Sequence, residues 1–195
     1  MVPELIICSG QEEARLQPVG LSGLVEKMSA LLKTSIPGRS SLHLDLCADL
    51  PSVLGSASQI RRLLMKLVAN ASQAIGDHKG VVPVKTSLVM GGSFPATGRC
   101  RDPEEDHIRS DVSYPGCGMT EEEMARIFDP FFTTQPRGHG LGLAVVHGII
   151  PSRRGAINVS VTRGKGTTIN RRDFSGASAS EDSLQPALRV GVEAL

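Results

Sequence analysis

The sequence predicts one mixed α/β domain, built from amphipathic helices and half-buried strands. Apolar residues recur at helical spacing between Leu21 and Lys33 and again after Ser56, which predicts two helices that each bury one face. Between Leu42 and Cys47 apolar and polar residues alternate, as they do in a strand with one buried face. A chain of 195 residues is long enough for one such domain with tails.

Composition restricts the classes of function. Hydrophobic residues make up 40% of the chain but aromatic residues only 3%, so the core has to be aliphatic. The net charge of +1 argues against nucleic-acid binding, because there is no basic excess to release counterions. No apolar run approaches the roughly 18 residues of a transmembrane helix, and Glu4, Glu12 and Glu13 interrupt any signal peptide. The four cysteines are scattered and predict free thiols, so we expect a cytoplasmic domain.

The first half of the chain is read as connector, helix, strand and helix. Residues 1–20 are short, mixed and broken by prolines, and Asp49–Gly55 reads as a loop. Ser56 and Gln59 have the spacing of a capping box at the start of the second helix. Asn70 lies beside the buried stripe of that helix, where an amide without partners costs about 1–3 kcal/mol. From these residues alone, Asn70 is a core amide bonded to the backbone.

The second half of the chain reads as strands separated by turns. Pro83 confines the strand Val81–Met90 to a sheet edge or a strand start. A loop should follow, then a strand at Ile108–Ser113 and a short helix whose first turn carries Glu121–Glu123.

The C-terminal part is expected to hold one hairpin and little else. A strand at Ala156–Val161, a turn at Gly164–Gly166 and a return strand from Thr167 to Ile169 form the predicted hairpin. The polar run Asn170–Asp173 should end the return strand. A disordered stretch over residues 175–181 and a short helix over 184–195 are expected to follow.

Two glycine clusters, Gly116–Gly118 and Gly138–Gly142, carry the chemistry of the sequence. Glycine lets the backbone approach a ligand closely and adopt positive φ. A glycine-rich turn that leads into a helix presents several free N–H groups and the positive end of the helix dipole, which favours phosphate. Either cluster alone is as well explained by an ordinary turn. Together, with Arg126–Thr134 between them, they are much more specific.

Four motifs occur in an order that resembles a known family. They are QIRRLLMKLVANASQAIGD, RIFDPFFTT, GHGLGLAVVHGI and GAINVSVTRGKGTTI. They resemble the N box, F box, G2 box and closing hairpin of the ATP-binding catalytic domain of sensor histidine kinases, in the GHKL superfamily, and the first glycine cluster resembles its G1 box. The resemblance spans residues 21–169.

The resemblance implies a fold and a division of the chain. The fold is a two-layer α/β sandwich, with a mixed sheet covered on one face by helices. Residues 1–20 are expected to be a remnant of the dimerisation helix with a connector, 21–172 the catalytic domain, and 173–195 a disordered tail.

The resemblance also assigns residues to ATP and Mg²⁺. It implies that the Asn70 side chain holds the Mg²⁺ that bridges the ATP phosphates, since magnesium prefers hard oxygen ligands. Lys66, one turn earlier, is a second candidate catalytic residue if it reaches a phosphate; the alternative is a lysine extending into solvent. The remaining expected ATP-binding residues are Tyr114, Gly116, Gly118, Met119, Gly138, Gly140, Leu141, Gly142, Leu143 and Thr167.

Three positions depart from the family pattern. Tyr114, followed by Pro115, stands where the family has an aspartate that accepts the adenine amino proton. Lys66 replaces the first asparagine of the N box, and Gln135 replaces a lysine that commonly follows the two threonines.

The leading hypothesis is the catalytic domain of a two-component histidine kinase. It would transfer the ATP γ-phosphoryl group to a histidine on a dimerisation hairpin, which this sequence lacks, and from there to a response-regulator receiver domain. The alternative is a degenerate pseudokinase fragment that acts as a protein-interaction module with weak or no ATP binding, which Tyr114 and Lys66 favour. A gyrase-type ATPase is disfavoured, because those hydrolases use a carboxylate at the position of Lys66 to activate water.

Overall fold

Two long helices form one layer of the domain. The computed structural model describes residues 16–36, 38, 40–90, 106–134, 143, 155–162, 164–174 and 187–191. Helix α1 is Leu21–Thr34 and helix α2 is Ala57–Ile75, close to the predicted bounds. The Ser56 hydroxyl accepts a hydrogen bond from the Gln59 N–H (3.5 Å), as its capping position predicts. The apolar stripes of both helices are buried, which confirms the helical periodicity read from the sequence.

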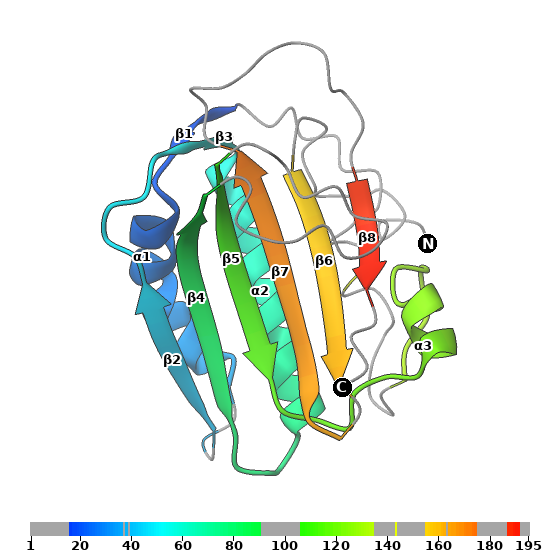
Figure 1. Ribbon diagram of the computed structural model, residues 1–195. Coiled ribbons are helices and arrows are strands. Elements are labelled where there is room, and N and C mark those ends of the chain that lie inside the picture. Colours follow the sequence, from blue (N-terminus) through cyan, green and yellow to red (C-terminus); the bar gives the residue numbers. More distant parts are fainter. Residues whose placement is uncertain are drawn as a thin grey trace, which may run out of the picture.

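The second layer is a mixed sheet of six strands in the order β2-β4-β5-β7-β6-β8 (Figure 1). Its strands are β2 (Ser41–Leu46), β4 (Val81–Val89), β5 (His107–Tyr114), β6 (Gly155–Thr162), β7 (Gly166–Phe174) and β8 (Ala187–Gly191). The outer pairs β2–β4 and β6–β8 are parallel, and the inner pairs are antiparallel. The predicted two-layer α/β sandwich is confirmed.

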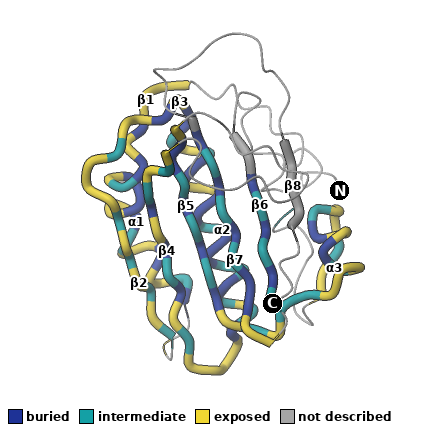
Figure 2. The backbone as a smooth tube through the Cα atoms, in the orientation of Figure 1, coloured by how far each residue is buried: buried dark blue, intermediate teal, exposed yellow. Residues whose placement is uncertain are grey.

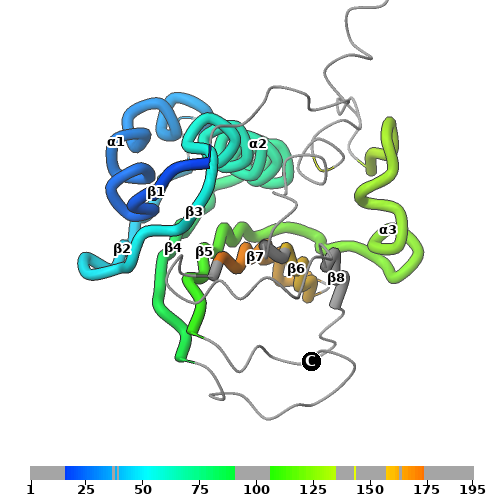
Figure 3. The backbone as a smooth tube through the Cα atoms, turned by 90° about the horizontal axis from the view of Figure 1, so that it is seen from above, coloured from blue at the N-terminus to red at the C-terminus, as the bar shows by residue number. Residues whose placement is uncertain are grey.

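Helices α1 and α2 lie on one face of the sheet, and the core fills the space between the layers (Figure 3). A row of buried aliphatic residues crosses four neighbouring strands on that face, in register: Val84, Val112, Ile169 and Val159. Burial is concentrated in α2 and the central strands, whereas β2 alternates between exposed and half-buried residues (Figure 2). The aliphatic core predicted from composition is therefore what joins the layers.

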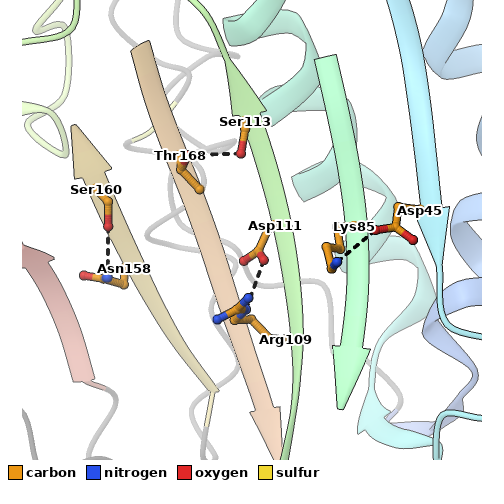
Figure 4. Close-up of polar contacts among 8 residues, drawn as sticks. All are labelled: Asp45, Lys85, Arg109, Asp111, Ser113, Asn158, Ser160 and Thr168. Atoms are coloured by element: carbon orange, nitrogen blue, oxygen red, sulfur yellow. Dashed lines mark hydrogen bonds and ion pairs between the residues drawn. The ribbon is translucent and has the colours of Figure 1, made fainter. Parts of the chain in front are cut away.

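The opposite face of the sheet is polar. Ion pairs join Lys85 to Asp45 (2.9 Å) and Arg109 to Asp111 (3.0 Å), and the Ser113 and Thr168 hydroxyls are hydrogen-bonded (3.0 Å; Figure 4). Partial burial raises the pKa of Asp111, and the Arg109 guanidinium opposes that shift. Apolar residues on one face and polar residues on the other give the strands their period-two pattern.

Several predictions from the N-terminal half need correction. Gln17–Val19 (β1) and Val53–Gly55 (β3), read as connector and loop, form a small antiparallel two-stranded sheet that packs beside the helices. Their shortness hid them, since three residues carry almost no periodicity. Pro83 lies in β4, an inner strand of the sheet, close to the start of that strand. It pairs with β2, whereas the pairing of β4 with β5 begins only at Val84. The prediction of a strand start is confirmed and that of an edge is wrong.

The expected end of the return strand at Asn170 is also wrong. Strand β7 continues to Phe174, and its helix-facing side there carries Arg171 and Asp173, both buried. Arg171 Nη2 donates to Asp173 Oδ1 (2.6 Å), so the two opposite charges are paired where the sequence suggested only polarity. Burial raises the pKa of Asp173, and the Arg171 charge opposes that shift.

The C-terminal expectations of a disordered tail from residue 173 and a short helix over 184–195 are wrong where the structure describes the chain. Asp173 and Phe174 belong to β7, and Ala187–Gly191 form strand β8, parallel to β6. An open sheet edge offers backbone partners that no local pattern can reveal.

Candidate functional site

The first glycine cluster lies against the C-terminal half of α2. A methyl group placed on Gly116 would sit 3.9 Å from the Ala74 side chain and carbonyl oxygen, an ordinary packing distance. Lys66, Asn70 and Ala74 are spaced four residues apart on α2 and therefore share one stripe of the helix. The structure thus brings Gly116 close to the stripe of α2 that also carries Asn70.

The polar groups of that helix stripe are accessible. Asn70 is half-buried and Lys66 is exposed, and the Asn70 amide makes no hydrogen bond to any described residue. The interpretation of Asn70 as a core amide bonded to the backbone therefore finds no support in the described contacts. Gly118, at φ +74°, adopts the left-handed conformation that glycine accommodates without strain.

Tyr114 ends β5 immediately before the glycine cluster. It is only 8% exposed, and its hydroxyl is hydrogen-bonded to the side chain of Thr167, its cross-strand neighbour on β7. Burial raises the pKa of Tyr114 to about 12, and the hydrogen bond to Thr167 opposes part of that shift. The pair places two hydroxyls and one aromatic ring on the helix-facing side of the sheet.

The turn between β6 and β7 fixes the backbone around Tyr114. Gly166 has φ +140°, and a methyl group there would collide with the Tyr114 carbonyl oxygen. The Gly164 N–H donates a hydrogen bond to the Cys117 carbonyl oxygen (3.0 Å). The hairpin turn therefore lies directly on the glycine cluster, a contact between segments about fifty residues apart in sequence.

Helix α3 (Glu121–Arg126) follows the cluster and carries the phenylalanine-rich segment behind it. Thr120 and Glu123 form a reciprocal capping box, and Met124 is buried. Met119, an expected adenine contact, is half-buried and packs against the core. The Arg126 guanidinium lies 4.6 Å from the centre of the Phe132 ring, which aligns the segment after α3.

The second glycine cluster lies outside the described residues, and the structure resumes only at Leu143, directly after it. Gly138, Gly140, Leu141 and Gly142, like Gln135, lie outside the described residues. Leu143 is helical and packs half-buried against the core. Of the expected ATP-binding residues, Asn70, Tyr114, Gly116, Gly118, Met119, Leu143 and Thr167 are thus described, and the phosphate-binding turn itself stays a prediction.

The Asn70 amide is a side chain that could contribute to holding a magnesium ion carried by phosphates. Among the described residues there is no group of three or more histidine, cysteine or acidic side chains that could hold a metal ion. The Asn70 amide offers one hard oxygen. An ion with a single protein ligand needs oxygens from phosphate and water for the rest of its shell, which is how magnesium is usually held.

Sequence reasoning missed two parts of the site. Ala74 was not among the expected site residues, yet it is the residue that a methyl group placed on Gly116 would meet, at 3.9 Å. Gly166 was read as a turn residue, whereas it permits close approach of β7 to the Tyr114 backbone. The glycine at the end of the turn was the only available signal, because the contact depends on how two distant strands pair.

The sequence matches a known protein family and several known kinases. Residues 55–172 match the model of the family described as "Histidine kinase-, DNA gyrase B-, and HSP90-like ATPase". The sensor histidine kinase ZraS of Escherichia coli (strain K12) is 31% identical over 185 residues, covering 90% of this chain and 36% of ZraS. Sporulation kinase E of Bacillus subtilis (strain 168) is 32% identical over 129 residues, covering 66% of this chain and 15% of that kinase.

Solved structures of histidine kinases also match this chain. Full-length ShkA in complex with AMPPNP has a TM-score of 0.67 and 26% identity, covering 86% of this chain and 33% of ShkA. The nucleotide-free catalytic domain of histidine kinase ThkA superposes with a TM-score of 0.64 at 23% identity, covering 82% of this chain and 95% of that domain, and supports the fold alone.

The chain therefore spans about a third or less of the length of the curated kinases named above. No helix in the described segments combines the length and apolar character needed to cross a membrane. The match over residues 55–172 shows that this chain belongs to the histidine kinase-, DNA gyrase B- and HSP90-like ATPase family, with the ATP-binding fold of histidine kinase catalytic domains.

Proposed function

We propose that the chain binds ATP with Mg²⁺ between α2 and the first glycine cluster, as the catalytic domain of a protein-histidine kinase. One observation carries the proposal: Gly116 packs on Ala74, one turn beyond the Asn70 amide, which has no hydrogen-bond partner in the described part of the chain. The glycine turn would form the end of the site that binds the base. The accessible amide would form the end that binds the phosphates and their metal ion. The matched family and the AMPPNP named with ShkA support the same ligand class.

Each residue has a proposed task. Gly116, Gly118 and Met119 lie beside the base, with Tyr114 and Thr167 behind them. Asn70 provides the amide oxygen for the metal, and Lys66 provides a point charge one turn earlier. Leu143 follows the second glycine cluster, where Gly138, Gly140, Leu141 and Gly142 would present backbone N–H groups to the phosphates.

Phosphoryl transfer suits such a site. It requires little covalent chemistry from the protein and depends on positioning and on stabilising charge. When bound, Mg²⁺ neutralises charge on the phosphate oxygens. The chain's own groups orient the triphosphate, so that a histidine on a dimerisation hairpin can attack the γ-phosphorus. The phosphoryl group would then pass to an aspartate of a response-regulator receiver domain.

Binding of a fluorescent ATP analogue tests the first half of the proposal. We expect saturable binding in magnesium that unlabelled ATP reverses and that EDTA largely abolishes. If no saturable binding occurs in magnesium, the proposal is wrong.

The kinase reaction is tested separately. The chain is mixed with the isolated dimerisation hairpin of ZraS and γ-labelled ATP, and acid-labile phosphate on the hairpin is measured. Hairpin labelling supports a kinase function. If nucleotide binds but no related hairpin becomes labelled, the chain is a nucleotide-binding domain without this activity.

A further inference from the structure

Strand β2 forms one edge of the sheet (Figure 1). The N–H and C=O groups of successive residues in a strand point alternately to its two sides, here toward β4 and toward the open side. The N–H groups of Ser41 and Cys47 donate to carbonyl oxygens in or beside β4, so odd-numbered residues of β2 bond inward. The even-numbered residues Leu42, Leu44 and Leu46 therefore direct their N–H and C=O groups to the open side. No described strand pairs with that side.

The side chains of β2 separate into two kinds. Leu42, Leu44 and Leu46 face the helices and are half-buried against the core. His43 and Asp45 lie exposed on the polar face. Asp45 is paired with Lys85 (2.9 Å; Figure 4), which lowers its pKa, while the residue beside His43 on β4 is Pro83. His43 thus has no charged residue directly opposite it in the described sheet.

The outward backbone groups and the side chains of β2 both match those of a second, antiparallel copy of the same strand. We infer that β2 is a self-association edge that pairs antiparallel with β2 of a second copy, with Leu44 of each chain opposite Leu44 of the other. In this register Leu42 faces Leu46, and His43 faces Asp45 twice across the two-fold axis. Every side chain then meets one of matching or opposite character.

The backbone supports the same register. Residues whose N–H and C=O groups point outward become the hydrogen-bonded pairs, which gives about six new bonds. His43 and Asp45 fall in the other kind of pair, where opposing side chains are closer together. A shift by two residues keeps the hydrogen-bond pattern but places His43 opposite His43 in one direction and Asp45 opposite Asp45 in the other, so the pairing of imidazole with carboxylate selects the first register.

The size of the contact predicts weak association. Six residues of strand bury much less than the roughly 1,200 Å² of a standard stable interface. The chain should therefore be mostly monomeric when dilute and dimeric when concentrated or held together by another contact. The charged residues and short length also limit pairing with unrelated strands.

Disulfide trapping tests the register in the full chain. Residues 41 and 47 of opposite copies face each other in the inferred pairing, and Cys47 is an exposed free thiol. Ser41→Cys should give a covalent dimer under mild oxidation, in which peptide mapping finds the new thiol at position 41 bonded to Cys47 of the other copy. Ser41→Cys with Cys47→Ser, and Glu122→Cys on helix α3, are the controls and should form no more covalent dimer than the unmodified chain. Absence of the link between position 41 and Cys47 from the oxidised Ser41→Cys chain overturns the inference.

A charge exchange tests it without cross-linking. His43→Asp places acids opposite each other and should weaken dimerisation roughly tenfold in sedimentation equilibrium. Adding Asp45→His to that variant restores opposite pairs and should recover most of the affinity. If the double variant is as weak as the single one, or if neither differs from the unmodified chain, the charges do not set the contact and the inference is wrong.

Discussion

The hydroxyl of Tyr114 is hydrogen-bonded to the side chain of Thr167, its direct neighbour across β5 and β7. A carboxylate at the Tyr114 position would be an acceptor only, whereas hydroxyl groups both donate and accept. The Tyr114 ring is also part of the core. The end of β5 is therefore closed and uncharged where the resemblance leads one to expect an exposed acid.

The ionisation of Tyr114 gives a direct test of this burial. The chain has one tyrosine and no tryptophan, so tyrosinate absorbance reports Tyr114 alone. We expect titration at a pKa of about 12 in the folded protein and near 10 in urea. Because the neutral form is favoured in the fold, its contribution to stability is complete below about pH 10. That contribution falls by about 1.4 kcal/mol per pH unit up to about pH 12. Titration of the folded protein near pH 10 would contradict the burial of Tyr114.

Restoring a carboxylate should restore selection of adenine. We predict that Tyr114→Asp with Pro115→Thr raises ATP affinity at least tenfold, because a charge-assisted hydrogen bond contributes about 1.5–3 kcal/mol. The gain should be absent with ITP, whose base lacks the exocyclic amine. Thr167→Val is the matched control, since it removes the partner hydroxyl without adding charge. An equal gain for both nucleotides, or no gain in a well-folded variant, would show that the base is bound in another way.

Asn70 should matter for nucleotide far more than for folding. Its amide lacks a hydrogen-bond partner among the described residues, so Asn70→Ala should change the melting temperature little. Loss of one metal ligand should weaken Mg-ATP at least about tenfold, with a smaller effect in EDTA. Asn158→Ala, a half-buried asparagine on the opposite face of the sheet, is the control. Parallel losses of melting temperature and affinity in Asn70→Ala would indicate a structural amide.

Gly166 should be among the least replaceable glycines. Gly166→Ala combines a positive φ with a collision against the Tyr114 carbonyl oxygen, so we expect a loss of about 2–5 kcal/mol in the free energy of unfolding. Gly23→Ala, on an exposed turn of α1 with nothing within 4 Å, should instead stabilise by about 0.5–1 kcal/mol. Urea denaturation measures both. A neutral Gly166→Ala would mean that β7 can move away from Tyr114.

The buried Arg171–Asp173 pair should cost stability only when it is broken. Asp173→Asn leaves a buried guanidinium without its partner and should destabilise by about 3–5 kcal/mol. Replacing both residues by leucine removes both charges, and should restore stability to near that of the unmodified chain or above it. If the double variant is less stable than Asp173→Asn, measured by urea denaturation, the ion pair contributes net stability.

Local patterns in the sequence determined most of the elements. The stripes of α1 and α2, the Ser56 cap and the alternation of Leu42–Leu46 depend on residues within one or two turns of each other, and the structure has them close to where they were predicted. The order of the motifs likewise identified the family before any distance was known. Such features need only the periods of helix and strand.

Tertiary structure alone decided the remaining features. Arg171 and Asp173 look like a strand end in sequence, but burial beside each other makes them part of β7. Gly166 acquires its role only because the β6–β7 turn lies on the end of β5. Strand β8 forms because β6, an earlier segment of the chain, offers an open sheet edge to pair with. Pairing partners and shared burial are properties of two distant segments at once, and no single stretch of sequence contains both.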